Sequence, residues 1–185
     1  EHERILSQLR RETTNLVLIG MPGCGKSTVG VLLAKALQMD FVDTDIVLQQ
    51  QQGKKLQEII DQVGNDAFLK MEEDCVRGLE CDQTIVATGG SVVYGKEAMR
   101  RLHENGLVVY IRLPYEEIER RLSNLATRGV TLKKGQTLRN LYDERIPLYE
   151  AEADYTFEPE EGDVQETVLD LAQRLSARME ADNGR

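Results

Sequence analysis

The sequence predicts an α/β domain built on a central, mainly parallel sheet of five strands. Short apolar segments alternate along the chain with stretches of helical periodicity, which is the pattern of helices packed on a parallel sheet. The first apolar segment ends in a glycine-rich loop that leads into a helix. The chain has 185 residues, close to the roughly 150 of a typical domain. We therefore expect residues 1–185 to form a single domain, with its ligand site beyond the carboxyl ends of the strands.

The first half of the chain alternates between strand and helix patterns. Residues 1–14 are amphipathic and highly charged, and they predict a helical extension ahead of the main fold. The apolar run at 15–20 predicts a strand buried on both faces, and residues 41–42 predict a second, shorter strand. Helices are expected to fill about 46–82, with breaks at two glycines. The helix between the strands is predicted from Val29, Leu32, Leu33, Ala36 and Leu37, and the breaks are Gly53 and Gly64.

The second half repeats the alternation. Residues 123–136 are polar, contain glycine and have weak apolar periodicity, so they form a candidate mobile loop. Pro114 suits the first turn of the helix before this loop. The predicted elements are strands at 84–88, 107–113 and 155–157, and helices at about 114–122, at about 137–153 and from about 164 onward.

Composition excludes several classes of protein. Hydrophobic residues make up 41% of the chain and charged residues 30%, which suits a globular protein with a buried core. The formal net charge of −9 disfavours nucleic acid as a partner. No apolar run approaches the roughly 18 residues of a membrane span, and residues 1–11 are charged where a signal peptide would be apolar. The three cysteines, Cys24, Cys75 and Cys81, lack zinc-ligand spacing and suggest reduced thiols. We expect a cytoplasmic monomer that contacts neither membranes nor nucleic acid.

Residues 20–27, GMPGCGKS, match the phosphate-binding pattern G-x-x-x-x-G-K-[ST] without deviation. Its glycines let backbone N–H groups surround phosphate oxygens, and the following helix directs its positive end at the same anion. Lys26 supplies charge to the β- and γ-phosphates, and the Ser27 hydroxyl suits the Mg²⁺ that accompanies ATP. A plain strand-to-helix turn is the alternative, and Cys24 fits a tolerated small residue better than a redox switch. The predicted nucleotide contacts are Gly23, Cys24, Gly25, Lys26, Ser27 and Thr28.

Two acidic residues and a double glycine follow other predicted strands. Asp43 and Asp45 alternate on what we expect to be an extended segment, so they should project to the same side. One can serve Mg²⁺ through water, and the other can orient an acceptor hydroxyl; helix N-capping by Asp45 or Thr44 is the alternative. Residues 89–91, Gly-Gly-Ser, would let backbone approach a small polar ligand, unless they form a plain turn.

Three arginines are candidates for binding anionic groups. Arg121 lies on the helix that leads into the polar loop, Arg128 lies in that loop, and Arg145 lies in a later helix. Each alone is more often a solvated surface charge. Together with the loop they can neutralise phosphate and clamp a carboxylate.

The order of these motifs resembles the shikimate kinases from about Leu16 to the terminal helix. The resemblance implies a three-layer α/β/α P-loop kinase with a mobile lid, which transfers the γ-phosphate of ATP to the 3-hydroxyl of shikimate. The phosphate-binding loop is shared by many families, whereas the other elements in this order are more specific. The motifs are GMPGCGKSTVG (20–30), FVDTD (41–45), the helix containing Phe68 and Glu72, ATGGSV (87–92), LVVYIRL (107–113), RRLSNLATRGV (120–130) and ERIPLY (144–149).

The resemblance also implies a role for each candidate residue. Asp43 would hold Mg²⁺ through water together with Ser27, and Asp45 would bind the acceptor hydroxyls. The helices at about 46–82 would bind the substrate, and residues 123–136 would be a lid that excludes water. Lys26, Asp45 and Arg128 would be catalytic. The remaining roles are Gly89 and Gly90 lining the shikimate pocket, Arg128 reaching the transferring phosphate, Arg121 stacking on adenine, and Arg145 pairing with the shikimate carboxylate.

The chain departs from the family pattern at three positions. Leu69 stands where the family has a second carboxylate-binding arginine, Ser91 replaces the third glycine of its loop, and Gly129 replaces the proline after the lid arginine. Lys70 is a candidate replacement for the missing arginine. These changes concern acceptor recognition or closure, so two alternatives stay open. The acceptor can be another small polyol or hydroxy acid, or the chain can be a non-catalytic nucleotide-binding regulatory protein.

Overall fold

The computed structural model describes residues 15–123, 130, 132–160 and 163–183. The predicted extension at 1–14 lies outside these residues, and so does most of the predicted lid, including Arg128 and Gly129. Among the described helices, none is both long and apolar enough to cross a membrane.

The five predicted strands form one sheet in the order β2-β3-β1-β4-β5, and every neighbouring pair is parallel. The prediction of a mainly parallel five-stranded sheet is therefore confirmed. Leu16 on the central strand lies opposite Ile85 on one side and Leu107 on the other, and all three strands carry buried apolar runs. The strands are β1 Asn15–Ile19, β2 Asp40–Asp43, β3 Thr84–Ala87, β4 Gly106–Ile111 and β5 Tyr155–Phe157.

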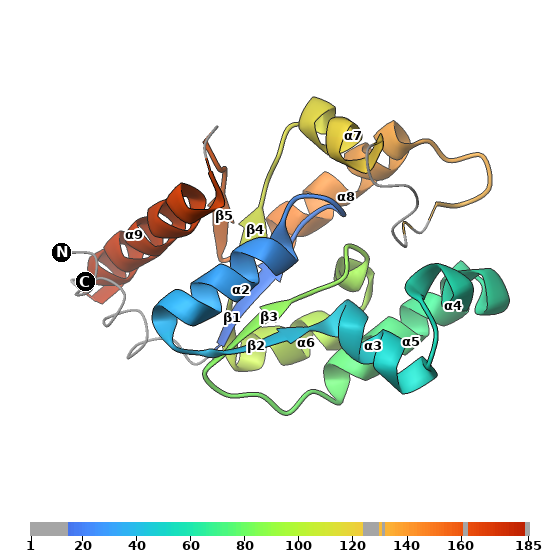
Figure 1. Ribbon diagram of the computed structural model, residues 1–185, viewed down its shortest axis with the longest axis horizontal. Helices are drawn as coiled ribbons and strands as arrows, with labels where there is room; N and C mark the ends of the chain where they lie inside the picture. The colour runs from blue at the N-terminus through green and yellow to red at the C-terminus, as the bar shows by residue number, and fades with distance from the viewer. Residues whose placement is uncertain (1–14, 124–129, 131, 161–162, 184–185) are drawn as a thin grey trace.

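Helices cover both faces of the sheet and complete three layers (Figure 1). Helix α2 packs on β3 and on α9 at one face, whereas α6 and α8 pack on β4 at the other. The helices are α2 Lys26–Leu37, α3 Thr44–Gln52, α4 Leu56–Val63, α5 Asn65–Arg77, α6 Lys96–Glu104, α7 Tyr115–Ser123, α8 Leu138–Glu152 and α9 Val164–Asn183, with a short 3₁₀ turn at Val92–Tyr94. The predicted helices agree with these bounds to within a few residues, including the breaks at Gly53 and Gly64.

Helices α3, α4 and α5 have an apolar core of their own beside the main one. Its buried members are Leu48, Ile59, Ile60, Phe68 and Cys75. This small core, defined here as the α3–α5 core, stands apart from the large cluster that joins the sheet to α2, α6, α8 and α9. The three helices therefore lie together beside the sheet, and α5 joins them to the main core through Val76 and its packing on α6 (Figure 1).

Candidate active site

The loop between β1 and α2 has the conformation that its glycines predict. Gly23 and Gly25 have φ angles of 80° and 98°, in the left-handed region that side chains other than glycine rarely adopt. Lys26 is the first residue of α2 and is buried, and its ammonium donates to the carbonyls of Gly20 at 2.8 Å and Met21 at 2.9 Å. The lysine is therefore folded across its own loop at the amino end of the helix, where an anion is best stabilised.

Cys24 lies beneath this loop. Its side chain is buried, and its backbone N–H donates to the Met21 carbonyl at 3.2 Å. The residue does not line the cleft that the neighbouring loop residues border. Its role toward the nucleotide stays a prediction.

Asp43 ends β2 and caps α3. One of its carboxylate oxygens accepts from the backbone N–H of Asp45 at 3.0 Å and of Ile46 at 3.3 Å. Because these bonds stabilise the first amides of α3, the helix begins at Thr44. The expectation that Asp43 and Asp45 alternate on an extended segment was therefore wrong, and so was the alternative in which Asp45 or Thr44 is the cap. Asp45 belongs to the first helical turn.

The other oxygen of Asp43 accepts a hydrogen bond from the Ser27 hydroxyl at 2.6 Å. This contact joins the phosphate-binding loop to the end of β2 with two hard oxygen donors, which are the ligands that Mg²⁺ prefers. In the described part of the chain, no three histidine, cysteine, aspartate or glutamate side chains cluster as a metal site. A Mg²⁺ ion held here would take its remaining ligands from water and phosphate, and the Ser27–Asp43 pair fits that role.

A cleft of about 960 Å³ opens beyond the carboxyl ends of the strands. It brings together residues that lie far apart in sequence and that the sequence singles out. Those lining it are Gly23, Gly25, Lys26, Ser27, Thr28, Asp43, Asp45, Gly89, Gly90 and Arg121. The lining also includes residues to which the sequence analysis gave no role, among them Lys55, Glu72, Thr88 and Arg120.

Glu72 is the most informative of these. It occupies the buried stripe of α5 that also contains Phe68, Cys75 and Val76, at helical spacing. A glutamate in an otherwise apolar stripe is the signal that could have identified it, because carboxylates are seldom fully buried without a function or a partner. Burial raises the pKa of Glu72 to about 7, and the neighbouring Asp45 charge contributes to the rise.

Gly89 lets two carboxylates approach the same loop. A Cβ at this position would lie 2.1 Å from Oε1 of Glu72 and 2.7 Å from Oδ1 of Asp45, so any larger residue would displace at least one of them. Burial first, and the Asp43 charge second, raise the pKa of Asp45 to about 6. The arrangement therefore gives the cleft a pair of proton-binding groups that titrate near neutral pH.

Arg145 stands directly behind Gly90. Its side chain is buried, a Cβ at Gly90 would lie 3.0 Å from its Nη1, and its guanidinium stacks over the Tyr94 ring at 5.3 Å. The Tyr149 hydroxyl, one helical turn further along α8, donates to the Gly90 carbonyl at 2.5 Å. The predicted carboxylate-binding arginine is thus next to the double-glycine loop, although it is not itself among the lining residues.

Arg121 lies at the edge of the phosphate-binding loop. It donates to the Gly23 carbonyl at 3.3 Å and to the Glu117 carboxylate at 2.6 Å. Hydrogen bonds from Arg120 and Arg121 lower the pKa of Glu117 to about 2. Glu117 therefore holds two arginines of α7 beside the loop, which is compatible with the predicted contact between Arg121 and the nucleotide.

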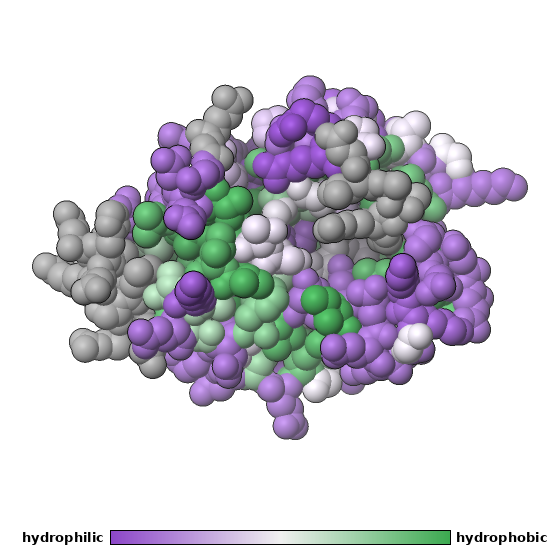
Figure 2. All heavy atoms as spheres, viewed as in Figure 1, coloured by the Kyte–Doolittle hydropathy of each residue, from purple (hydrophilic) through white to green (hydrophobic). Residues whose placement is uncertain are grey.

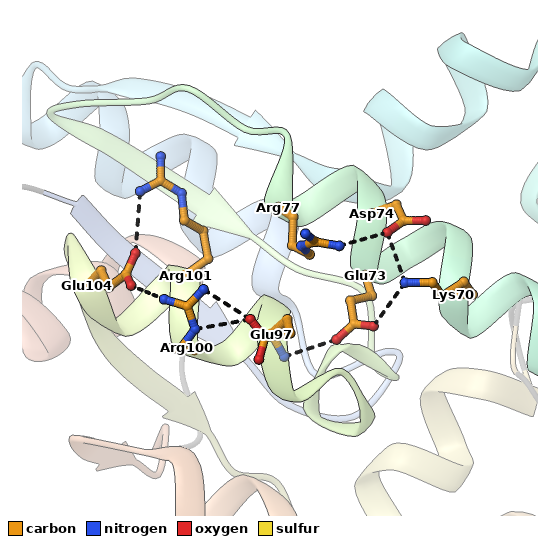
Figure 3. Close-up of polar contacts among 8 residues, drawn as sticks. All are labelled: Lys70, Glu73, Asp74, Arg77, Glu97, Arg100, Arg101 and Glu104. Atoms are coloured by element: carbon orange, nitrogen blue, oxygen red, sulfur yellow. Dashed lines mark hydrogen bonds and ion pairs between the residues drawn. The ribbon is translucent and has the colours of Figure 1, made fainter.

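Lys70 does not replace the arginine missing at Leu69. Figure 3 shows its side chain directed at Glu73 and Asp74 on the surface of α5, where the ion pairs measure 3.7 Å and 3.1 Å. The backbone N–H of Glu97 on α6 also binds Glu73, so Lys70 belongs to a network between these two helices. Leu69 is half-buried and, within the described residues, does not line the cleft. The lysine that does line the cleft is Lys55, at the start of α4.

Comparison with known proteins assigns the chain to a family. Residues 22–176 match the protein family described as shikimate kinase. The chain is 36% identical over 170 residues to the shikimate kinase of Vibrio parahaemolyticus, an alignment that covers 90% of this chain and 99% of the relative. It is 39% identical over 137 residues to the shikimate kinase of Clostridium botulinum, covering 72% of this chain and 81% of the relative.

Solved structures agree. The shikimate kinase of Acinetobacter baumannii, in complex with shikimate, aligns with a TM-score of 0.78 at 29% identity and covers 95% of this chain and 98% of its own. That of Aquifex aeolicus aligns with a TM-score of 0.72 at 28% identity, covering 90% and 98%. The resemblance seen in the motifs and the predicted three-layer fold are both confirmed. The chain belongs to the shikimate kinase family.

Proposed function

We propose that this chain phosphorylates shikimate with ATP at the 3-hydroxyl. The observation that carries the proposal is the cleft in which the phosphate-binding loop and Asp45 face the same space, bordered by Gly89 and Gly90. The family uses ATP, and the A. baumannii relative is described in complex with shikimate. A regulatory protein that only senses a nucleotide would have no need of the acceptor carboxylates in this cleft.

In the proposed reaction an acceptor oxygen forms a bond to the γ-phosphorus of ATP, while the bond from that phosphorus to the β–γ bridging oxygen breaks and ADP leaves. Lys26 neutralises charge on the β- and γ-phosphates. Ser27 and Asp43 would hold Mg²⁺, which neutralises phosphate charge when bound. Asp45 orients the acceptor hydroxyl and accepts its proton late in the transfer. A pKa of about 6 keeps Asp45 in its anionic form at neutral pH.

The remaining roles follow from position. Arg145 suits the acceptor carboxylate because it is buried beside Gly90. Arg121 borders the nucleotide end of the cleft. Arg128, proposed as the lid cation, lies outside the described residues. A monomeric state and a cytoplasmic location remain predictions.

Leu69 and Ser91 keep a second acceptor in consideration. Both positions bear on acceptor recognition, and the chain lacks the second arginine that a carboxylate would use. A related small polyol or hydroxy acid is therefore the competing acceptor, with the same ATP chemistry.

A coupled assay of ADP release tests the proposal with shikimate and a panel of cyclic polyols and hydroxy acids. We expect turnover with shikimate and little with the others. Lys26→Ala should lower kcat/KM by at least about 10²-fold through lost phosphate stabilisation. Asp45→Asn should lower kcat by about 10² to 10⁴-fold while ATP affinity stays close to that of wild type. Turnover of another acceptor in preference to shikimate would overturn the acceptor, and loss of ATP affinity in Asp45→Asn would overturn the role of Asp45.

A further inference from the structure

The Glu72 carboxylate has two oxygens in unequal surroundings. Oε2 accepts a hydrogen bond of 2.5 Å from the Ser91 hydroxyl. Oε1 is buried and has no hydrogen-bond partner among the described residues. A buried oxygen that accepts no hydrogen bond destabilises the folded chain. Because this oxygen belongs to a residue that lines a ligand cleft, the ligand itself can supply the missing hydrogen-bond donor.

The unpartnered oxygen lies beside Gly89, on the same side as the Asp45 carboxylate. Oε1 and the Asp45 carboxylate both pack against Gly89. A Cβ added to this glycine would lie too close to both of them. Glu72, Asp45, Gly89 and Ser91 all line the cleft. Two carboxylates on one side of a glycine match two neighbouring hydroxyls on one face of a polyol.

The Ser91 hydroxyl binds one of the two Glu72 oxygens and leaves the other without a partner in the described part of the chain. It is buried, and it precedes the 3₁₀ turn Val92–Tyr94, in which the Tyr94 N–H donates to its carbonyl at 3.0 Å. Val92 N–H also donates to the Gly89 carbonyl at 3.3 Å. These bonds fix the backbone of Ser91, so its hydroxyl holds Oε2 from a rigid support.

We propose that Ser91 is a positioning residue that holds Glu72 by Oε2, so that Oε1 binds a hydroxyl of the acceptor next to the one that Asp45 orients. The inference rests on the proposed function and deepens it, because it assigns the acceptor a second hydroxyl contact through a serine that replaces the family's glycine. Asp45, Lys26, Arg145 and Ser91 are the groups that act on Glu72 electrostatically or by hydrogen bonding. With a pKa of about 7, Glu72 can donate as well as accept a hydrogen bond near neutral pH.

Steady-state kinetics of Ser91→Ala test the proposal with ATP and shikimate. Without the serine donor Glu72 is free to rotate, so KM for shikimate should rise roughly 3- to 10-fold, the effect of one hydrogen bond, while kcat and KM for ATP change little. Ser91→Thr keeps the hydroxyl and should restore most of the loss. Thr84→Val is the matched control, since Thr84 is a buried hydroxyl residue at the other end of β3, bonded to the Asp82 carbonyl. It should leave KM for shikimate unchanged.

A double-mutant cycle separates positioning from packing. In a Glu72→Ala background, which lacks the acceptor of the Ser91 hydroxyl, Ser91→Ala should add little further rise in KM, because the serine acts through Glu72. Two analogues of shikimate, each lacking one of the ring hydroxyls other than the 3-hydroxyl, locate the contact. Wild type and Ser91→Ala should have equal KM for the analogue that lacks the hydroxyl bound by Glu72. Two results would overturn this inference alone, provided that wild type turns over shikimate. One is an unchanged KM for shikimate in Ser91→Ala, and the other is full additivity of the losses caused by the Ser91 and Glu72 substitutions. No turnover of shikimate by wild type would overturn the proposed function and this inference with it.

Discussion

Glu72 and Asp45 are held as neighbours in a partly dry cleft, and this placement should weaken the folded state. In the folded chain the pKa of Glu72 is about 7, above the 4.5 of an ordinary glutamate. The folded chain therefore holds a proton that the unfolded chain releases between these two values. Stability should fall as pH rises from about 4.5 to about 7, by up to about 3 kcal/mol from this residue.

Glu72→Gln removes that titration and should unfold at higher denaturant concentration than wild type at pH 8, with a much smaller gain at pH 5. Urea unfolding at the two pH values measures the difference. An exposed glutamate serves as the control: Glu97→Gln should change the denaturation midpoint little, because Glu97 is solvent-exposed and its ion pair with Arg100 lies on the surface. A Gln variant no more stable than wild type at pH 8 would contradict the expectation.

The pKa of Asp45 sets an acid limit on activity. Asp45 orients the acceptor as a carboxylate, so kcat/KM for shikimate should fall as pH drops through about 6. The measurement is a pH profile at saturating ATP, with ATP affinity determined separately over the same range. An acid limb near pH 4, the ordinary range of an aspartate, would show that the Asp45 carboxylate is not perturbed.

The motif residues of the site were predictable because short sequence patterns specify them. Lys26, Ser27, Asp43, Asp45, Gly89 and Gly90 could be selected from their motifs and from the family resemblance, and all six line one cleft. Glu72 was named only as part of a motif and was given no role, because its importance depends on how α5 packs against the double-glycine loop. The direction of Lys70 likewise depends on the neighbouring helix α6, through Glu73 and Glu97.

At the scale of elements, α4 contributes a cation to the acceptor side of the cleft. Lys55 lines the cleft at the start of this helix and, within the described residues, its ammonium forms no ion pair. Lys54 precedes it, but bonds to Gln62 and does not line the cleft. The two lysines thus form a matched pair for mutagenesis.

We expect Lys55→Ala to raise KM for shikimate roughly 2- to 5-fold, which is the effect of an exposed charge pair. The acceptor carboxylate would lose a positive neighbour on the side where Leu69 offers none. Lys54→Ala should leave KM unchanged, and a shikimate analogue without the carboxylate should abolish the difference between Lys55→Ala and wild type. If Lys54→Ala raised KM for shikimate as much as Lys55→Ala does, the rise would come from the lost positive charge of the protein and not from the position of Lys55 in the cleft.

Element boundaries were predictable where apolar periodicity changes abruptly and less so where a side chain caps a helix. The strands predicted at 84–88 and 107–113 are recognisable from their apolar runs at 85–87 and 107–111, because both faces of these strands are largely buried. The junction at 43–45 was misjudged, because the sequence D-T-D suits an extended segment and a helix start equally well. The deciding bonds, from Asp43 to the amides of Asp45 and Ile46, exist only once α3 has formed.

The whole molecule consists of two regions with different apolar support. The sheet and its covering helices share the large core, to which α5 adds Val76, whereas α3 and α4 are buried mainly against the small α3–α5 core. Figure 2 shows polar side chains over α4 and α7 and apolar ones gathered over α2 on the same face. Because local stability follows buried apolar contact, the region of α3–α5 should open more readily than the sheet.

Hydrogen exchange followed by mass spectrometry checks this. Amides at 56–63 should exchange faster than those of β1 and β4 in the free protein. Shikimate should slow exchange in α4 and α5, and ATP should slow it mainly at the start of α2. Uniform protection across these helices and the sheet would show that the small core is as stable as the large one.

The division of the cleft between separate elements has a consequence for how such a chain diverges. The donor side centres on the loop between β1 and α2, where backbone geometry leaves little room for variation, and Asp43 and Arg121 lie at its edge. The acceptor side is assembled from α3, α4, α5 and the loop after β3, and includes positions such as Lys55 and Ser91 that are not tied to the phosphate-binding loop. Mutations there can alter which hydroxylated acid is recognised while the chemistry of the phosphoryl donor is inherited unchanged. Acceptor preference and phosphoryl-donor chemistry are therefore carried by largely different residues of one cleft.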